Sequence, residues 1–228
     1  MINDKNFFVA DEINKLGLRG IYLLFTGLTN LESLPAFEQY ERKMIQSILS
    51  GITEESIDSD PILLGFRNLH TKVNKSNKKN VSSPENLYRL VMKRGVMPHV
   101  NLLVDIYNLI SLKSKLALGA HDLQKIDGNI SLRLTNGEET FIPLGADAPK
   151  PIDKGAYAYV DDSNEIICYL EVRQVEKTKV TLKTTNCFYI IQGNESTPPE
   201  YIERSVEELI DLTKKYCGGN ATILARVW

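Results

Sequence analysis

P-H-V-N-L-L-V-D-I-Y-N-L-I-S-L-K-S-K-L-A-L-G-A-H-D, residues 98–122, combines a helical repeat with an unusual choice of polar side chains. Its apolar residues recur at helical spacing and predict one buried face, formed by Leu102, Leu103, Ile106, Leu109 and Ile110. Asn101, Asp105 and Asn108 share another face. Asn and Asp are poor helix formers because their side chains compete for backbone hydrogen bonds, so a solvated face would more naturally carry Lys and Glu. The pattern therefore predicts polar side chains selected for hydrogen bonding.

The second half of this stretch is predicted to leave the helix through Ser114 and Lys115. It reaches a predicted loop that holds Gly119, His121 and Asp122. Asp122 is expected to cap the short segment L-Q-K-I that follows it. The polar helix face would therefore meet a loop that carries a His and an Asp.

The composition indicates an ordinary globular protein of 228 residues, with 43% hydrophobic and 25% charged residues. A net charge of −2 argues against a protein that holds nucleic acid by bulk charge alone, although a local basic patch is compatible with it. Cys168, Cys187 and Cys217 lack C-x-x-C spacing and indicate neither a disulfide framework nor a zinc site. No apolar run reaches membrane-spanning length and the N-terminus lacks a signal-peptide pattern, so we expect a cytoplasmic protein without a membrane partner.

The N-terminal half is predicted to be mainly helical. Two strand-like runs at 7–10 and 20–28 precede amphipathic helices at 35–49 and 61–73, and a further helix starts at 83–85. The connector K-V-N-K-S-N-K-K-N-V-S-S has four lysines and no acid. It is either a solvated link or, because it precedes the motif helix, a contact for phosphates.

The C-terminal half is predicted to be rich in strands. Asn136-Gly137 between two alternating runs favours a two-residue hairpin turn, and a second hairpin is predicted across the turn D-D-S-N-E. A strand at 187–192, a helix at 200–216 and a last strand follow. The whole chain, 1–228, is predicted to be one α+β domain with a helical N-terminal half and a β-rich C-terminal half built as a mixed sheet or sandwich.

Two strings of this sequence, P-H-V-N-L-L-V-D-I-Y-N-L and L-A-L-G-A-H-D-L-Q-K-I, carry a resemblance to a known family. They are similar in order and spacing to P-I-N-N-V-V-D-I-x-N-Y and L-G-x-P-L-H-A-F-D-L-D-K-L. These are patterns of the tRNA-binding editing module, domains B three and B four, of the bacterial phenylalanyl-tRNA synthetase β subunit. Freestanding single-module relatives, with a G-A-x-D form of the second motif, are more similar still. The resemblance implies the fold of that module.

The stretch 170–192 resembles the wall of the editing pocket in that family, which reads A-G-x-M-G-G-x-x-S-x-V and then T-x-N-x-L-L-E. An ungapped overlay matches the framework positions Thr178, Val180, Thr184 and Asn186. The pocket positions depart from the family, because its glycines become Glu171, Gln174 and Val175. The resemblance covers a motif core at 98–192.

Two functional side chains of the family are also replaced. The histidine of the family falls on Gly119 and its glutamate falls on Ile190. Side chains two positions further on, His121 and Gln192, would substitute for them. If 188–192 is a strand, its period of two places Ile190 and Gln192 on one face.

The resemblance implies hydrolysis of the ester that joins an amino acid to the terminal ribose of tRNA. That ester is activated, so an enzyme need only place a water and stabilise the oxyanion, without a metal, a cofactor or a covalent nucleophile. The implied catalytic residues are His121, Asn101 and Asp105. The implied substrate-binding residues are Asn108, Gly119, Arg173, Gln174 and Gln192. The implied contacts to the aminoacylated 3′ end of tRNA are Lys177, Lys75, Lys78 and Lys79.

Each assignment has a structural alternative. Asp105 and Asn108 would tie their helix to neighbouring backbone, and His121 would be a half-exposed loop histidine. Asp122 would be a helix cap. Arg173 and Lys177 would pair with Glu171 and Glu176 as a surface network, as charged residues on a strand edge usually do. His70 and His99 have no assigned role.

Three functions remain open at this point. The first is a freestanding aminoacyl-tRNA deacylase acting on mischarged tRNA. The second is a module that binds a tRNA end or an amino acid without chemistry, which the loss of the family's His and Glu favours. The third is a partner or scaffold protein that keeps only the fold. Since Gln174 and Val175 take up space, we expect an amino acid smaller or more polar than Tyr.

Overall fold

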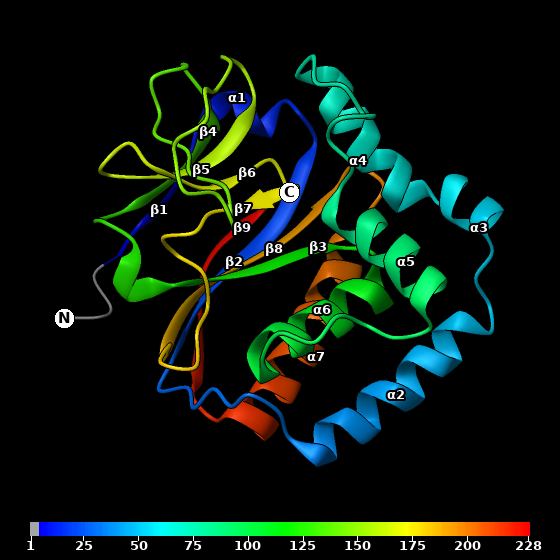
Figure 1. Cartoon of the computed structure of the whole chain (residues 1–228). Helices are drawn as coiled ribbons and strands as arrows, with labels where there is room; N and C mark the ends of the chain where they lie inside the picture. The colour runs from blue at the N-terminus through cyan, green and yellow to red at the C-terminus, as the bar shows by residue number, and fades with distance from the viewer. Residues whose placement is uncertain (1–4) are drawn as a thin grey trace.

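The structure, a computed structural model, describes residues 5–228 and has three layers (Figure 1). The helices are α1 (Asp11–Asn14), α2 (Pro35–Leu49), α3 (Glu54–Asp58), α4 (Pro61–Lys72), α5 (Ser83–Arg94), α6 (Leu102–Ser114) and α7 (Pro199–Cys217), with a 3₁₀ turn at Leu123–Lys125. One sheet has the order β3 (Ala117–Asp122), β8 (Asn186–Asn194), β2 (Leu18–Thr26) and β9 (Asn220–Val227). The other has the order β1 (Phe7–Val9), β4 (Ile130–Leu134), β5 (Tyr157–Asp161), β6 (Ile166–Tyr169) and β7 (Arg173–Gln174).

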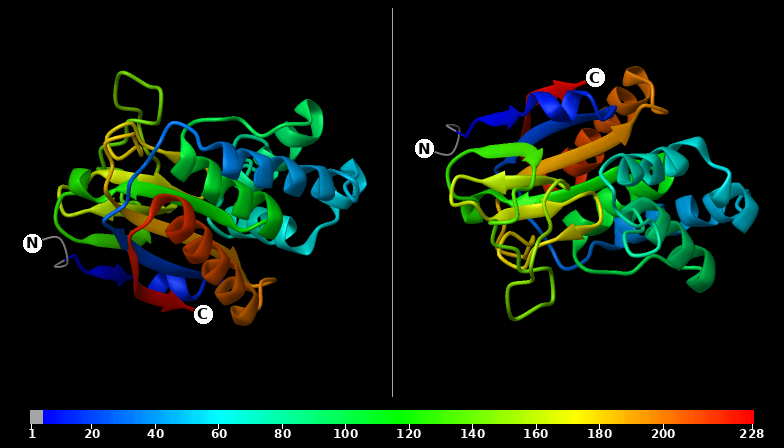
Figure 2. Two further views of the ribbon diagram at one scale, coloured as in Figure 1. Left: turned by 90° about the horizontal axis from the view of Figure 1, so that it is seen from below. Right: turned by 90° about the horizontal axis from the view of Figure 1, so that it is seen from above.

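The four-stranded sheet forms the middle layer; its strands β3, β8 and β2 are buried on both faces, whereas the edge strand β9 is partly exposed. Along β2, Ile21, Leu23 and Phe25 pack in the core shared with α2, α5, α6 and α7. The alternate residues Tyr22 and Leu24 pack in the core shared with the five-stranded sheet. Because side chains alternate along a strand, a sheet between two layers needs an almost continuous apolar sequence, as β2 has. Figure 2 shows from two further directions that α2, α5, α6 and α7 lie on one side of this sheet.

The same alternation places the end of the motif stretch between the two sheets. Leu118 and Ala120 of β3 face the helices. Gly119 and His121, one residue out of phase, therefore face the five-stranded sheet. In the antiparallel ladder Gly119 lies opposite Ile190 of β8.

The overall architecture confirms the predicted α+β domain, and most predicted elements are present. Asp122 accepts a hydrogen bond from the backbone of Gln124 (3.0 Å) and caps the 3₁₀ turn, as expected. The hairpin of β5 and β6 also forms. The segment 117–122, however, is strand β3 and not a loop, because every residue of it pairs with β8.

The hairpin predicted at Asn136-Gly137 does not form. Gly137 has the left-handed backbone of a turn (φ 89°), and the Glu139 carboxylate accepts hydrogen bonds from the backbone of Asn136 and Gly137. Beyond this turn, however, the chain makes only isolated bridges, and β4 pairs with β5 instead. The local turn signal was right, but tertiary pairing determined the partner strand. Within residues 5–228, no helix is long and apolar enough to cross a membrane.

Gly65 of α4 offers a test of the contact between this helix and the middle sheet. A Cβ atom there would lie 2.0 Å from Oδ1 of Asn194, whose side chain is held by Ile62 O and Ser196 N. Gly65→Ala is expected to lower the free energy of unfolding by about 1–3 kcal/mol, although Ala favours a helix more than Gly does. Chemical denaturation measures this loss, and Gly51→Ala, whose Cβ would meet Ile48 O at an ordinary contact distance of 4.0 Å, is the control. Equal stabilities of the two variants would contradict this packing.

Candidate functional site

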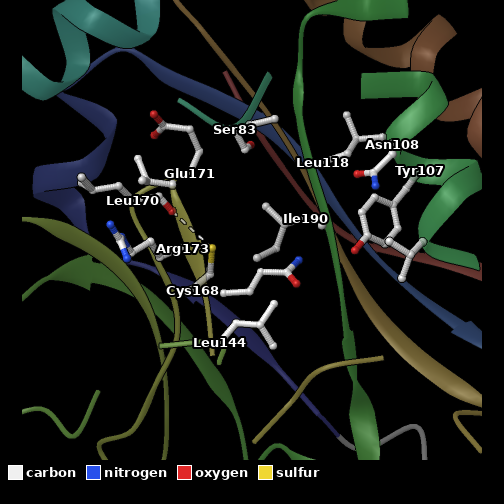
Figure 3. A pocket seen from close by; sticks show the side chains of 15 residues that line it. Ser83, Tyr107, Asn108, Leu118, Leu144, Cys168, Leu170, Glu171, Arg173 and Ile190 are labelled. Atoms are coloured by element: carbon white, nitrogen blue, oxygen red, sulfur yellow. Dashed lines mark hydrogen bonds between the residues drawn. The ribbon is translucent and has the colours of Figure 1, made fainter. Parts of the chain in front are cut away.

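A cavity of about 250 Å³ lies between α6, the start of β3 and the turn that follows β6 (Figure 3). Its polar lining consists of Ser83, Tyr107, Asn108, Glu171, Arg173 and Gln174. Figure 3 shows Tyr107 and Asn108 on one side of Ile190, and Cys168, Leu170, Glu171 and Arg173 on the other. The cavity is therefore bounded by the helical layer, the middle sheet and the five-stranded sheet, and we call it the interlayer pocket.

Four of the five expected substrate-binding residues line the interlayer pocket: Asn108, Gly119, Arg173 and Gln174. Asn108 is half-buried, in contrast to its neighbours on α6, and its side chain reaches the pocket. Gln192 is fully buried and does not line the pocket. Its Oε1 accepts a hydrogen bond from the Tyr159 hydroxyl (2.7 Å), so it belongs to the polar core behind the pocket.

Glu171 is a buried carboxylate at the wall of the pocket, and the sequence did not identify it as a site residue. Its Oε1 lies 2.5 Å from Nε2 of His70. Its Oε2 accepts a hydrogen bond from the Tyr157 hydroxyl and a longer one from Nε2 of Gln192 (3.5 Å). A carboxylate offers about four acceptor positions, so these three donors leave one of them unused.

His70 completes a buried acid–base pair with Glu171. Burial acts to lower the pKa of His70, but the Glu171 carboxylate and the side chain of Asn77 outweigh it and hold the pKa above its usual value. Asn77 Oδ1 lies 3.2 Å from Nδ1 of the same ring. A charged His70 compensates the carboxylate, because an unpaired charge in the interior would be strongly destabilising.

The turn that carries Glu171, a lining residue of the pocket, has an unusual backbone. Leu170 is fully buried and has a positive φ of 51°, a conformation that costs a β- or γ-branched residue free energy. Its backbone N–H donates to Tyr157 O (3.1 Å), which holds the turn against β5. Strain of this kind persists where surrounding structure imposes it, and it often accompanies functional sites.

Arg173 stands at the mouth of the interlayer pocket as an exposed cation. It makes no ion pair with any residue in the described part of the chain, 5–228, so the expected alternative pairing with Glu171 is not found. An adjoining cavity of about 480 Å³ shares Leu144, Val172, Arg173 and Gln174 with the pocket and adds Lys79 and Asn86. We call this second cavity the outer groove. Together the two form a path from the surface to Glu171.

Asn101 and Asp105, expected to be catalytic, do not line the interlayer pocket. Asn101 is the N-cap of α6: its Oδ1 accepts from Val104 N (3.2 Å) and from the Asn30 side chain (3.0 Å). Asp105 accepts from Val100 N (3.0 Å) and lies 2.7 Å from Nδ1 of His99. Both therefore hold the start of α6 to the preceding chain, which is the structural alternative for Asp105.

His121 is fully buried in β3 and is not the half-exposed loop histidine of the alternative reading. Its Nδ1 lies 2.8 Å from Oγ1 of Thr178. Burial lowers the pKa of His121 to about 3. Its Nε2 lies behind Gly119, so the ring does not line the pocket in this structure.

The lysines expected at tRNA separate into two groups. Lys177 pairs with Asp127 (2.6 Å), with Glu165 and with Asp161 (3.5 Å), and Lys75 lies 3.4 Å from Asp153. The carboxylates around Lys177 are close enough to share a cation, and the Lys177 ammonium supplies that charge. Lys78 and Lys79 are exposed and have no ion-pair partner among residues 5–228. Of the four, Lys79 lines the outer groove.

Cys168 is a buried core residue that also lines the interlayer pocket. Burial, with the nearby Glu171 charge, raises the pKa of its thiol well above the usual value. Its Sγ is directed at Leu170 O (3.3 Å). A protonated, inward-bonded thiol is a poor nucleophile.

The comparisons with known proteins agree with this architecture. A family model described as the B3/4 domain matches residues 66–218. The phenylalanine–tRNA ligase beta subunit of Mycoplasma genitalium is 30% identical over 124 residues, which are 54% of this chain and 15% of that protein. The corresponding Wolbachia subunit is 27% identical over 169 residues, 73% of this chain and 21% of that protein. The chain therefore matches only 15% to 21% of the length of these relatives.

A solved structure has the same fold. It is an N-terminal fragment of the phenylalanyl-tRNA synthetase beta subunit from Pyrococcus horikoshii, with a TM-score of 0.50 and 14% sequence identity. The match covers 96% of this chain and 50% of the fragment. At this identity the likeness describes the fold alone.

Asn101→Ala is expected to lower the free energy of unfolding by about 1–2 kcal/mol, because the N-cap acceptor of α6 is lost. Asn101→Ser keeps a cap oxygen and is expected to lose less. Urea denaturation of both variants measures the difference. A destabilisation by Ser as large as that by Ala would show that the cap bond contributes little.

The His70–Glu171 pair predicts a specific dependence of stability on pH. The pKa of His70 is raised in the folded state. The contribution of the charged pair to the free energy of unfolding is therefore fully present below the pKa of an unfolded histidine, about 6.5, and is lost as the pH rises through the pKa of folded His70. Relative to His70→Gln, the wild-type free energy of unfolding should therefore fall from about pH 6.5 upward. Denaturation of both proteins across this range tests it. If the stability difference between wild type and His70→Gln instead grew with pH, the pKa of His70 would be lowered on folding and not raised.

Proposed function

Since the chain belongs to the B3/4 domain family, we propose that it hydrolyses the ester of mischarged aminoacyl-tRNA in trans. The observation that carries this proposal is the interlayer pocket, whose lining includes the buried Glu171 and the exposed Arg173, which makes no ion pair among residues 5–228. An aminoacyl ester at the 3′ end of tRNA offers the complementary charges: a cationic α-ammonium group beside a polyanionic strand. The names of the relatives, which refer to a tRNA ligase subunit, support the same substrate class.

In the proposed reaction the oxygen of a water molecule attacks the ester carbonyl carbon. The carbon–oxygen bond to the ribose breaks, and one proton of the water passes to the ribose oxygen, so that the tRNA regains its terminal hydroxyl. The amino acid leaves as a carboxylate and the second proton is released to solvent. Glu171 would receive the α-ammonium group through its remaining acceptor capacity, and Asn108 would bind a polar group of the ester from the opposite wall. Fixing an activated ester beside water is itself a large part of the rate enhancement.

The outer groove gives the tRNA end a route to this pocket. Lys79 and Arg173 line it, and both are exposed cations suited to phosphate oxygens. Leu144, 53% exposed, offers an apolar surface between the two cavities on which a base or ribose can pack. Lys177 is a poorer candidate because three carboxylates already surround its ammonium group.

The pocket also supports a small or polar amino acid. The side chain of Gln174 extends over Gly119, with its amide nitrogen 2.6 Å from the place of a Cβ atom there. It fills space that an aromatic side chain would need. Faster hydrolysis of a tyrosyl ester than of small esters would contradict this preference.

A second candidate function is binding of a tRNA end or an amino acid without hydrolysis. The observation that favours it is that none of His121, Asn101 and Asp105 lines the pocket. Binding of aminoacyl-tRNA with an unchanged ester lifetime would support this candidate over the first.

The test is the lifetime of a panel of aminoacyl-tRNAs with and without the purified protein. One or a few esters are expected to hydrolyse faster, and Glu171→Gln should lower kcat/KM for them about 10- to 100-fold, because a charge-assisted hydrogen bond is lost. Arg173→Gln should raise KM roughly tenfold with little change in kcat, because Arg173 would bind the tRNA strand equally well in the ground state and in the transition state. Unchanged lifetimes across the whole panel would overturn the proposal.

Arg94→Gln is the matched control for these measurements. It removes the same charge from an exposed arginine on α5 that lines neither the interlayer pocket nor the outer groove. It should leave the kinetics near wild type and the salt dependence unchanged. Arg173→Gln and Lys79→Gln should each reduce the salt dependence of tRNA binding by about one phosphate contact. Equal effects of Arg94→Gln and Arg173→Gln would indicate that tRNA is attracted non-specifically by the surface charge.

A further inference from the structure

His121 carries a buried hydrogen-bonding atom that has no partner. Its side chain is fully buried, and Nε2 has no hydrogen-bond partner among residues 5–228. Nearly all buried polar atoms in proteins are paired, so an unpaired ring nitrogen indicates a function or a ligand. The other ring nitrogen, Nδ1, is 2.8 Å from Oγ1 of Thr178.

The hydrogen bond with Thr178 assigns the proton of the imidazole ring. The Thr178 hydroxyl is fully buried and has His121 as its partner in the described chain. If Nδ1 carried the proton, the hydroxyl hydrogen would be left without an acceptor in the interior. Donation from Oγ1–H to Nδ1 satisfies both groups and places the ring proton on Nε2. The lowered pKa of His121, about 3, keeps the ring in this neutral form at ordinary pH.

Nε2 of His121 is directed at Gly119, a residue of the interlayer pocket. A Cβ atom on Gly119 would lie 4.0 Å from this nitrogen and 2.6 Å from the amide nitrogen of Gln174. The place above Gly119 is therefore filled by the Gln174 carboxamide. Gln174 is half-buried and borders both the interlayer pocket and the outer groove. Its side chain lies beside the hydroxyl of the buried Tyr107 and acts to lower the pKa of that group, so an outward rotation would break this contact.

We propose that His121 donates a hydrogen bond from Nε2 to the carbonyl oxygen of the bound ester, and that the Gln174 carboxamide vacates this place when the ester enters. The proposal rests on the proposed function and deepens it. Gly119 has no side chain, which lets a carbonyl group approach the ring. His121 then acts as a donor to the developing oxyanion and not as the general base that its residue type suggests.

A donor of this kind suits the chemistry of ester hydrolysis. Negative charge develops on the carbonyl oxygen when water attacks, and a donor held in a dry site stabilises it without reorganisation. Thr178 is a positioning residue in this scheme, because it fixes the tautomer without touching the substrate. Gly119 and His121 share one face of β3, so the ring lies on the same side of the middle sheet as the pocket residue Gly119.

The first experiment observes the tautomer directly in the full-length protein. Nitrogen-15 NMR of the three histidines distinguishes a protonated ring nitrogen from an unprotonated one. His121 is expected to show Nε2–H and an unprotonated Nδ1 throughout the neutral range. In Thr178→Val the fixed tautomer should be lost, whereas Thr178→Ser should keep it. An Nδ1–H form in the wild type would overturn the proposal.

The second experiment uses alanyl-adenosine in which an amide replaces the ester, a probe that binds without being hydrolysed. Saturation with it should shift the Nε2 resonance of His121, and failure to bind or to shift this resonance would overturn the proposal. Gln174→Gly, which empties the place above Gly119, should tighten probe binding roughly five- to tenfold, and Gln174→Met, which keeps the volume, should not. Equal affinities of these variants would also count against it.

Kinetics separate this proposal from the proposed function. His121→Leu should lower kcat about 100-fold, and His121→Gln, which keeps an N–H donor, should retain more of it. If the probe shifts Nε2 but no ester is hydrolysed, the donor role stands and the deacylase proposal fails. If esters are hydrolysed while His121→Leu keeps full kcat, the deacylase proposal stands and the donor role fails.

Discussion

The Glu171 carboxylate, buried against His70, Tyr157 and Gln192, is the interaction on which the arrangement around the pocket depends. Its partners come from α4, β5 and β8, so one charged group joins the helical layer, the five-stranded sheet and the middle sheet. Burying a carboxylate is unfavourable unless hydrogen bonds and an opposite charge replace water. Here they do so within the wall of a cavity. The protein therefore keeps its buried carboxylate in the wall of the pocket, where a charged ligand would bind.

A second constraint is a pair of residues, one without a side chain and one with a long side chain, on strands of the two facing sheets. Gly119 of β3 leaves a place that the Gln174 side chain of β7 fills, and His121 lies behind that place. Gln174 thus sets both the size of the interlayer pocket and access to the buried ring. The framework of motif residues can therefore stay the same while a different side chain contacts the ligand. The strained turn at Leu170 serves the same region, because Glu171 and Arg173, which follow it directly, both line the cavity.

Local sequence signals were sufficient for much of the fold. Helix Pro35–Leu49, the Asp122 cap and the strand at 186–194 follow from periodicity and capping. The pairing of strands did not follow, because Asn136-Gly137 specifies a turn but not the partner of β4. The family motifs located Asn108, Gly119, Arg173 and Gln174 at one pocket.

Glu171 and His70 were missed as a pair because a helix and a turn a hundred residues apart meet only in three dimensions. The partial signal was an acid inside the apolar run I-I-C-Y-L-E-V.

The middle sheet has a consequence for how the chain is made. Strand β2, at 18–26, pairs with β8 and β9, at 186–194 and 220–227. Its apolar residues can therefore be paired only after a long stretch of further chain has been synthesised, and until then they are exposed to aggregation.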